Sequence, residues 1–261
     1  MMPPEEAPRA LREYNEWVRT LAHSPLKVTL KLSSAVAAAD YIAFDGLLYY
    51  AVLSRTIDDK LYGEYAREGS HFLDPLLPLW ATHRYDADGG VRHHFYLASV
   101  AAFDTPVVQT DRWRKRTTDF DSDRGKVDIS RGTYKMFDAA IPCTPATEAV
   151  FWAFGNKEEV GSLLSEVPAI GKKTAYGYGN VSSYTVEEVE GDSSLVGSGG
   201  ALNRCVPAEC VSVYEGDAAV RGYRPPYWKK QNHVRCVLPG SKAVLKGLYL
   251  PKHYRWAGAK P

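Results

Sequence analysis

The sequence has few cysteines and no long apolar run, and each absence excludes a class of protein. Its four cysteines, among 261 residues, form no C-x-x-C pair. Cys205, Cys210, His233 and Cys236 would have to make up any zinc site, and their spacing departs from the common zinc motifs, so we expect no metal and no other cofactor. Because there is no secretory signal and no apolar run of about 18 residues, we expect a cytoplasmic protein with reduced thiols and no membrane contact.

The sequence also lacks a net charge that would by itself indicate a partner. It carries 32 Lys and Arg against 31 Asp and Glu, a formal net charge of +1. The distribution is uneven, however, because residues 218–261 contain ten Lys or Arg and no Asp or Glu, whereas acidic residues gather at positions 187–192. Such asymmetry is typical of a nucleic-acid-binding protein. A solvated basic tail is the alternative that composition leaves open.

The most informative segment is residues 170–179, which read Ile-Gly-Lys-Lys-Thr-Ala-Tyr-Gly-Tyr-Gly. A segment with helical spacing precedes it, with Asn156 as the predicted N-cap and Glu159 at the capping-box position, and a β-like segment follows it. Dinucleotide and P-loop motifs run in the opposite order, from strand to loop to helix, so both are excluded. Backbone N–H groups at glycines, together with paired lysines, instead predict a site for a polyanionic backbone. We predict that the residues of this segment that contact the polyanion are Gly171, Lys172, Lys173, Tyr176, Gly177, Tyr178 and Gly179.

The pattern of apolar residues along the chain predicts an α+β protein. Residues 27–33 alternate and predict the first strand, and the apolar residues 44–53 predict a buried helix. Strands are expected at 76–84 and 91–103 around a turn at 85–90, and at 150–154 and 181–186 on either side of the second helix. A further amphipathic helix is expected at residues 10–22, and a long ribbon at 107–139 with its turn near 121–125.

This order is β-α-β-β-α-β, which predicts a ferredoxin-like domain with an inserted hairpin. We place that domain at residues 27–196, with the hairpin at about 107–139. Residues 1–26 form an N-terminal extension. Residues 197–261 form a basic, aromatic C-terminal extension after a glycine-rich break at 197–200.

Two further groups of residues have the composition of a nucleic-acid contact. In the predicted ribbon, basic side chains surround an aromatic ring, and three more return on the other arm: Arg112, Trp113, Arg114, Lys115, Arg116, Lys126, Arg131 and Lys135. Such a ribbon can hold phosphates and stack one base, although a salt-bridged hairpin facing solvent would have the same composition. The second group is Arg221, Arg224, Tyr227, Lys229 and Lys230. There the lysines suit phosphate, whereas Tyr227 and the adjacent Trp228 fit core or subunit packing at least as well as base stacking.

The loop at 170–179 resembles the G-rich loop before the last strand in the RAMP superfamily of CRISPR proteins. Two other segments extend the resemblance to the small RAMP subunit, a Cas five-like protein, that caps the crRNA in type IV CRISPR effector complexes. They are Tyr-Ile-Ala-Phe-Asp-Gly-Leu-Leu at 41–48 and Arg-Pro-Pro-Tyr-Trp at 224–228. The resemblance covers roughly residues 28–236.

This resemblance implies a ferredoxin-like fold whose inserted hairpin is a thumb pressing on the crRNA where the 5′ handle meets the spacer. It implies a non-catalytic RNA-binding subunit that binds the handle and caps the filament of backbone (Cas seven-like) subunits. The expected partners are crRNA, those backbone subunits, the large subunit and target DNA near the protospacer-adjacent motif.

The main alternative is an enzyme, because related RAMP proteins cut crRNA without a metal. That reaction needs a general acid and base, commonly His, Tyr or Lys, and the candidates are His93, His94, Tyr41 and Lys31. Adjacent histidines in a strand point to opposite faces, so at most one of them could reach the RNA. Because no convincing catalytic set emerges, we expect no enzyme. A protein that reads double-stranded DNA by itself is a third possibility.

Overall fold

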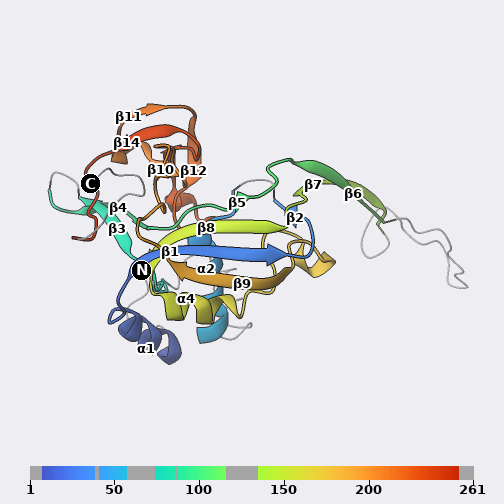
Figure 1. Cartoon of the computed structure of the whole chain (residues 1–261), viewed down its shortest axis with the longest axis horizontal. Helices are drawn as coiled ribbons and strands as arrows, with labels where there is room; N and C mark the ends of the chain where they lie inside the picture. The colour runs from blue at the N-terminus through green and yellow to red at the C-terminus, as the bar shows by residue number, and fades with distance from the viewer. Residues whose placement is uncertain (1–7, 39–40, 58–73, 86–87, 116–134, 253–261) are drawn as a thin grey trace, which may run out of the picture.

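A computed structural model describes residues 8–38, 41–57, 74–85, 88–115 and 135–252 and shows a mixed α/β protein built from antiparallel sheets (Figure 1). The helices in these ranges are α1 (Arg9–Val18), α2 (Phe44–Thr56) and α4 (Lys157–Leu164). The strands are β1 (Ser24–Leu32), β2 (Val36–Ala37), β3 (Ala81–Tyr85), β4 (Val91–Tyr96), β5 (Ala102–Phe103), β6 (Gln109–Lys115), β7 (Phe137–Thr144), β8 (Glu148–Gly155), β9 (Val181–Glu188), β10 (Val206–Pro207), β11 (Val211–Glu215), β12 (Ala218–Gly222), β13 (His233–Val237) and β14 (Lys242–Leu245). Short 3-10 turns occur at Thr174–Tyr176, Ala208–Cys210 and Lys230–Asn232.

The central sheet has the strand order β5-β8-β1-β9, with every neighbouring pair antiparallel. Successive side chains of a strand point to opposite faces, so the alternation seen in the sequence of β1 buries Leu26, Val28 and Leu30 on one face. Side chains of α1, α2 and α4 join them in one apolar core, where the rings of Phe44 and Phe151 lie 5.1 Å apart. The predicted first strand, buried helix and last strand are therefore confirmed.

The N-cap of α4 is confirmed, but the predicted capping box is not. The Glu159 N–H donates to Asn156 Oδ1 at 2.9 Å, whereas the Asn156 N–H donates to the carbonyl of Pro78. The Glu159 carboxylate instead accepts hydrogen bonds from the Tyr14 hydroxyl, at 2.9 Å, and from Arg55, at 2.8 Å. These tertiary partners hold α1 against α2 and α4, which the local sequence around Asn156 could not indicate.

Two hairpins differ in how closely they follow the predicted strands. Strands β3 and β4 pair as the two arms of the expected hairpin, but β3 begins only at Ala81, β4 ends at Tyr96, and β5 pairs separately with β8 in the central sheet. In the long ribbon β6 pairs with β7, and β7 pairs with β2. This ribbon extends away from the body of the molecule (Figure 1). Its predicted turn near 121–125 lies outside the described residues.

The C-terminal strands form small sheets around a second apolar core. This core contains Leu195, Val206 and Cys210 together with Phe95 and Leu97 from the β4 region and Phe154 from β8. The glycine-rich break predicted at residues 197–200 is a hydrogen-bonded turn, in which the Gly200 N–H donates to the carbonyl of Gly197 at 2.9 Å. The end of β8 thus contributes side chains to both apolar cores.

The structure also shows where the cysteines lie, how possible metal ligands are arranged and whether a described helix could span a membrane. All four cysteines are buried, and no disulfide joins them. Within the described residues, no group of three His, Cys, Asp or Glu side chains is arranged to hold a metal ion. None of the helices described is long and apolar enough to span a membrane.

Candidate nucleic-acid interface

Backbone hydrogen bonds fix both ends of the glycine loop, residues 170–179. The Ile170 N–H donates to the carbonyl of Gly179 at 2.9 Å, which closes the base of the loop. The N–H groups of Lys172 and Gly179 donate to the carbonyls of Ala37 and Ala35, at 2.7 and 2.8 Å. Residues 171–177 are exposed. The loop is therefore held rigidly at its base and presents its middle to solvent.

Positive φ angles at the loop glycines confirm that the sequence needs glycine there, for different reasons at different positions. Gly177 and Gly179 have φ angles of 88° and 68°. A Cβ on Gly179 would lie 1.9 Å from the carbonyl oxygen of Ile170, whereas a Cβ on Gly177 would meet nothing within 4 Å. Gly179 is thus required for the loop to close on its own backbone, and Gly177 leaves open space beside the chain on the solvent side.

The loop packs against the base of the β6–β7 ribbon, about 60 residues earlier in the chain. The rings of Trp113 and Tyr176 lie 4.3 Å apart between centroids, and Lys173 Nζ lies 4.8 Å from the Trp113 centroid. The Tyr178 hydroxyl donates to the Asp111 carboxylate. This bond lowers the pKa of Asp111 and raises the pKa of Tyr178 to about 12. Two segments that the sequence suggested separately therefore form one surface, which we call the loop–ribbon surface: Trp113, Lys115, Lys172, Lys173, Tyr176 and Tyr178.

The ribbon has two faces of different character, so its predicted basic cluster is divided. Arg112 and Arg114 both pair with Asp138, at 2.9 and 3.1 Å. Trp113 lies on the opposite face, where it packs on Phe137 at 4.6 Å. Strand alternation places Lys115 on the Trp113 side. The other ribbon residues expected to bind, Arg116, Lys126 and Arg131, lie outside the described residues.

The loop–ribbon surface is positively charged at the loop. Lys172 and Lys173 are exposed, and neither takes part in an ion pair in the described part of the chain. Tyr176 is 59% exposed, so its ring is open to a ligand on one side while Trp113 packs on the other. Two cations beside an accessible aromatic ring can bind a phosphate and stack a planar group at the same time.

The C-terminal segment meets the Phe-Asp-Gly segment of α2 in the interior. The Tyr227 hydroxyl donates to Asp45 Oδ1 at 2.7 Å, and Arg204 donates to Asp45 Oδ2 at 3.3 Å. Asp45 is 0% and Arg204 2% exposed, so this is a buried ion pair. Burial raises the pKa of Asp45, while Arg204 and the Tyr227 hydroxyl oppose that rise. The phenol of Tyr227 thus has a packing role, and sequence reasoning missed Arg204 because no motif surrounds it.

The remaining predicted C-terminal residues are placed differently from one another. Arg224 is half-buried and donates to Asn232 Oδ1 at 2.9 Å, and it also contacts His94 Nδ1 at 3.2 Å. Lys229 is half-buried, while Arg221 and Lys230 are exposed. Of these basic residues, Arg221 and Lys230 are therefore the most accessible to a ligand.

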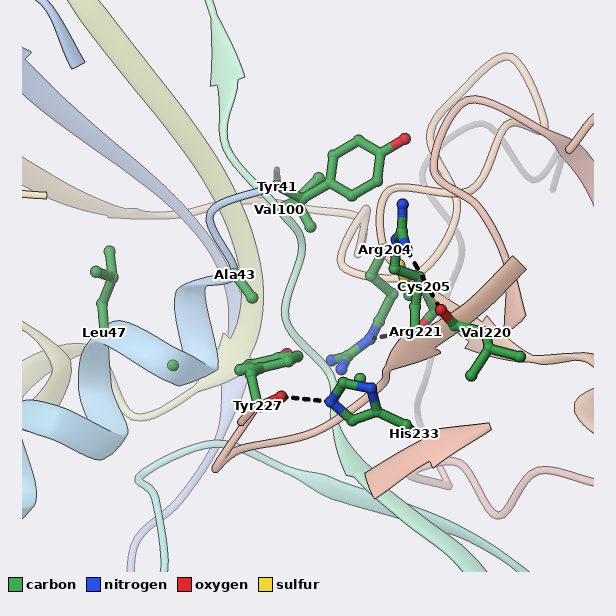
Figure 2. Close-up of a pocket in the computed structure, with 12 residues that line it drawn as sticks. Tyr41, Ala43, Leu47, Val100, Arg204, Cys205, Val220, Arg221, Tyr227 and His233 are labelled. Carbon is green, nitrogen blue, oxygen red and sulfur yellow. Dashed lines mark hydrogen bonds between the residues drawn. The ribbon is translucent and has the colours of Figure 1, made fainter. Parts of the chain in front are cut away.

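A cavity of about 360 Å³ lies between the start of α2 and strand β12 (Figure 2). Tyr41, Leu47 and Val100 line it on one side, and Val220 and Arg221 on the other. The ring of Tyr227 and the side chain of Arg204 also contribute to its walls. The sequence suggested Tyr41 and Arg221 for separate roles, and nothing in their spacing indicated that they meet.

The four candidates for acid–base catalysis lie in different surroundings. Lys31 forms an ion pair with Glu148 on the central sheet, and Tyr41 lines the cavity. His93 is 6% exposed with Nε2 3.3 Å from Glu209, whereas His94 faces Arg224. Burial lowers the pKa of both histidines. The adjacent histidines have different partners, as strand geometry predicts, and no described hydrogen bond or ion pair joins any two of the four candidates.

Comparison with known protein families shows a match that begins at β4 and ends after β13. The model of the family described as CRISPR type IV associated protein Csf3 matches residues 89–239, which is more than half of the chain. The matched region contains the β6–β7 ribbon, the glycine loop and the segment around Tyr227. A search of curated proteins found no match.

Proposed function

Because the chain belongs to the Csf3 family of type IV CRISPR-associated proteins, we propose that it is the subunit of a type IV CRISPR complex that binds the 5′ handle of the crRNA. In this role it caps the filament of backbone subunits. The loop–ribbon surface is the observation that carries the proposal, because it places exposed lysines and an accessible aromatic ring on a loop whose backbone hydrogen bonds hold it rigid. Phosphate contacts then position the RNA, and base contacts are few.

The arrangement of the central sheet supports a RAMP-like, ferredoxin-like core. Helix α2 lies between β1 and β5 in the chain, and α4 lies between β8 and β9, which is the β-α-β-β-α-β order. The sheet order β5-β8-β1-β9 puts the first and third of these strands in the centre. In this proposal the β6–β7 ribbon, inserted between the second and third strands, is the thumb.

The proposed partners follow from where the exposed elements lie. The ribbon extends away from the body, so it can reach a neighbouring backbone subunit along the RNA (Figure 1). We assign the large subunit and the flank of target DNA near the protospacer-adjacent motif to the exposed basic residues of the C-terminal strands. A cytoplasmic location accords with this role.

The first test replaces the two loop lysines. Lys172→Ala with Lys173→Ala should weaken binding to single-stranded RNA of any sequence and reduce the slope of log affinity against log salt by about 0.7 per lysine. Lys157→Ala, on the exposed start of α4, is the matched control and should change neither quantity. The RNA that copurifies with the wild-type complex should begin with a repeat fragment. An unchanged slope in the double variant would remove the loop from the interface.

We also propose that the protein does not cut RNA. The separation of His93, His94, Tyr41 and Lys31 into different environments supports this, since an acid–base pair must reach one 2′-hydroxyl. Purified protein incubated with repeat RNA without metal should leave it intact. A single defined cut, lost in His93→Ala or His94→Ala, would instead establish the nuclease, because such a group contributes about a hundred- to ten-thousand-fold in rate.

A further inference from the structure

An acidic side chain, Asp111, lies beside the loop–ribbon surface and is exposed. Strand alternation places Asp111 on the same face of β6 as Trp113, about 7 Å from it along the strand. The loop contacts both of them. The ring of Tyr176 packs on Trp113, and the hydroxyl of Tyr178 donates to the Asp111 carboxylate. The acidic group therefore lies next to the aromatic ring that is open to a ligand.

Hydrogen bonds hold the Asp111 carboxylate in place without saturating it. Its Oδ2 accepts from the Tyr178 hydroxyl, and its Oδ1 accepts from the N–H of Arg112 at 2.7 Å. A carboxylate has about four lone-pair positions, so each oxygen can accept from a further donor. The bond from Tyr178, and then that from Arg112, lowers the pKa of Asp111, so the group is ionised at neutral pH and only accepts. Within the part of the chain that the structure describes, Asp111 forms no ion pair.

A fixed carboxylate restricts which part of an RNA can approach it. It repels a phosphate, so phosphates belong at Lys172 and Lys173, and a hydrogen-bond donor of the RNA belongs at Asp111. Bases of single-stranded RNA stack on aromatic rings and are read on their Watson–Crick edges, which carry such donors. A base on the open face of Tyr176 has its edge within reach of Asp111, because Trp113, which packs on that ring, is the neighbour of Asp111 on the same face of β6.

Guanine is the base whose donors match a carboxylate best. Its N1–H and its 2-amino N–H lie side by side on the Watson–Crick edge, so each can donate to one carboxylate oxygen, as two N–H groups of a guanidinium do. Adenine, cytosine and uracil each present a single donor group on that edge. A ring nitrogen or a carbonyl oxygen lies beside this donor and is repelled by the second carboxylate oxygen.

We propose that Asp111 selects a guanine at one position of the bound RNA, with the base stacked on Tyr176 and its Watson–Crick edge on the Asp111 carboxylate. The inference rests on the proposed function and adds one specific base contact to its phosphate contacts. Tyr178 is a positioning residue, because its hydroxyl orients the carboxylate. A ribose 2′-hydroxyl is the competing donor, but it offers one O–H where guanine offers two N–H groups.

The test measures the affinity of the purified protein for short oligouridines that carry guanosine, adenosine, cytidine or inosine at one central position. Wild-type protein should bind the guanosine oligonucleotide roughly five- to 150-fold more tightly than the adenosine or cytidine one, the range for one bidentate contact to a base. Inosine keeps N1–H but lacks the 2-amino group, so its oligonucleotide should bind with intermediate affinity.

Three variants separate base reading from a structural role. Asp111→Asn keeps an acceptor for Tyr178, but an amide matches adenine as well as guanine, so the preference for guanosine over adenosine should disappear. Tyr178→Phe removes the same hydrogen bond and keeps the carboxylate, so it should bind more weakly and still prefer guanosine. Asp138→Asn, the same exchange on the opposite face of the ribbon, is the matched control and should keep the full preference. Because the readout is a ratio of affinities within each variant, a loss of folded protein does not imitate it.

Three results would overturn the inference. One is equal binding of all the oligonucleotides by the wild type, and with a loss on 2′-deoxy substitution it would assign the carboxylate to the ribose. Another is a preference for guanosine that persists in Asp111→Asn. The third is a preference lost equally in Asp111→Asn and Tyr178→Phe, which would mean that Asp111 only holds the loop. In each of these cases binding that depends on Lys172 and Lys173 leaves the proposed function standing. Wild-type protein that binds none of the oligonucleotides would refute both.

Discussion

Two glycines of the loop, Gly177 and Gly179, both have a positive φ angle but lie in different surroundings. Gly177→Ala places a methyl group in open space, so it costs only the strain of a positive φ, about 1–2 kcal/mol. Gly179→Ala places the methyl group 1.9 Å from the backbone oxygen of Ile170 and must displace the loop. We expect this cost to exceed the usual range of about 0.5–3 kcal/mol for a point mutation.

Urea denaturation of the two alanine variants measures this difference, and RNA binding adds a second readout. Gly179→Ala should also weaken RNA binding, because Lys172 and Lys173 lie on the displaced loop. Gly177→Ala should bind RNA nearly as the wild type does. If both variants lose equal stability, the contact between residues 170 and 179 does not close the loop in solution.

The buried pair of Asp45 and Arg204 makes a second prediction at single residues. Asp45→Ala leaves the Arg204 guanidinium buried without its counter-ion, which should lower the free energy of unfolding by about 3–5 kcal/mol. Tyr227→Phe removes one hydrogen bond to the carboxylate and should cost about 1.5–3 kcal/mol. Tyr50→Phe, on the exposed side of α2, is the control and should cost nothing measurable. Equal stability of Asp45→Ala and wild type would mean that this pair does not hold the C-terminal segment.

The sequence identified some of these residues and could not identify others, for physical reasons. Gly171 to Gly179 are recognisable because glycine and lysine spacing within one short loop carries the signal. Arg204 is isolated in the sequence, and its role arises from a contact with Asp45, 159 residues away. The cavity was missed for the same reason, since Tyr41 and Arg221 are far apart in the sequence and line one cavity only in the folded chain.

At the scale of elements, the β6–β7 ribbon predicts that its two faces contribute unequally to RNA binding. Trp113 packs behind Tyr176, the ring that is open to a base, so Trp113→Ala should displace that ring and lose part of the about 1–3 kcal/mol that one base–aromatic stack contributes to affinity for single-stranded RNA. Arg112→Ala with Arg114→Ala should have a smaller effect, because Asp138 already offsets part of their charge. Fluorescence anisotropy at fixed salt measures both.

Asp138→Ala is the control for this comparison. It removes the offsetting carboxylate, so it tightens RNA binding only if the Arg112 face touches the RNA. We expect no change. A larger loss from the double arginine variant than from Trp113→Ala would place the RNA on the other face of the ribbon.

Periodicity predicted most elements because strand alternation and helical spacing are local properties. It gave β1, α2 and the N-cap of α4 close to their observed positions, and it placed the β3–β4 hairpin but began its first strand five residues too early. It overestimated the strand after the hairpin, where β4 ends at Tyr96 and β5 contains only two residues. The chain changes sheets between them, and that change depends on pairing with β8, which a local pattern does not encode.

At the scale of the whole molecule, the two apolar cores are not independent. Phe95, Leu97 and Phe154 belong to the core of the C-terminal strands, although they lie within residues 27–196, the predicted ferredoxin-like domain. The ion pair between Asp45 and Arg204 crosses the predicted boundary at residue 196. The composition of the sequence marks a change at this boundary, but the packing extends across it.

A chain ending at residue 196 should therefore fail to fold on its own. The truncation would expose Phe95, Leu97 and Phe154 and leave Asp45 buried without Arg204 or Tyr227. Losing the partner of a buried charge costs about 3–5 kcal/mol, and the exposed apolar side chains add to this, against a total stability of about 5–15 kcal/mol for a typical domain. Circular dichroism and urea denaturation should show no cooperative transition in the truncated chain and a single transition in the full one. The additional substitution Asp45→Leu removes the uncompensated charge, and if it does not restore folding, the lost apolar contacts destabilise the truncated chain more than the buried charge does. A truncated chain that unfolds cooperatively without it would establish residues 197–261 as a separable extension, as the sequence predicts.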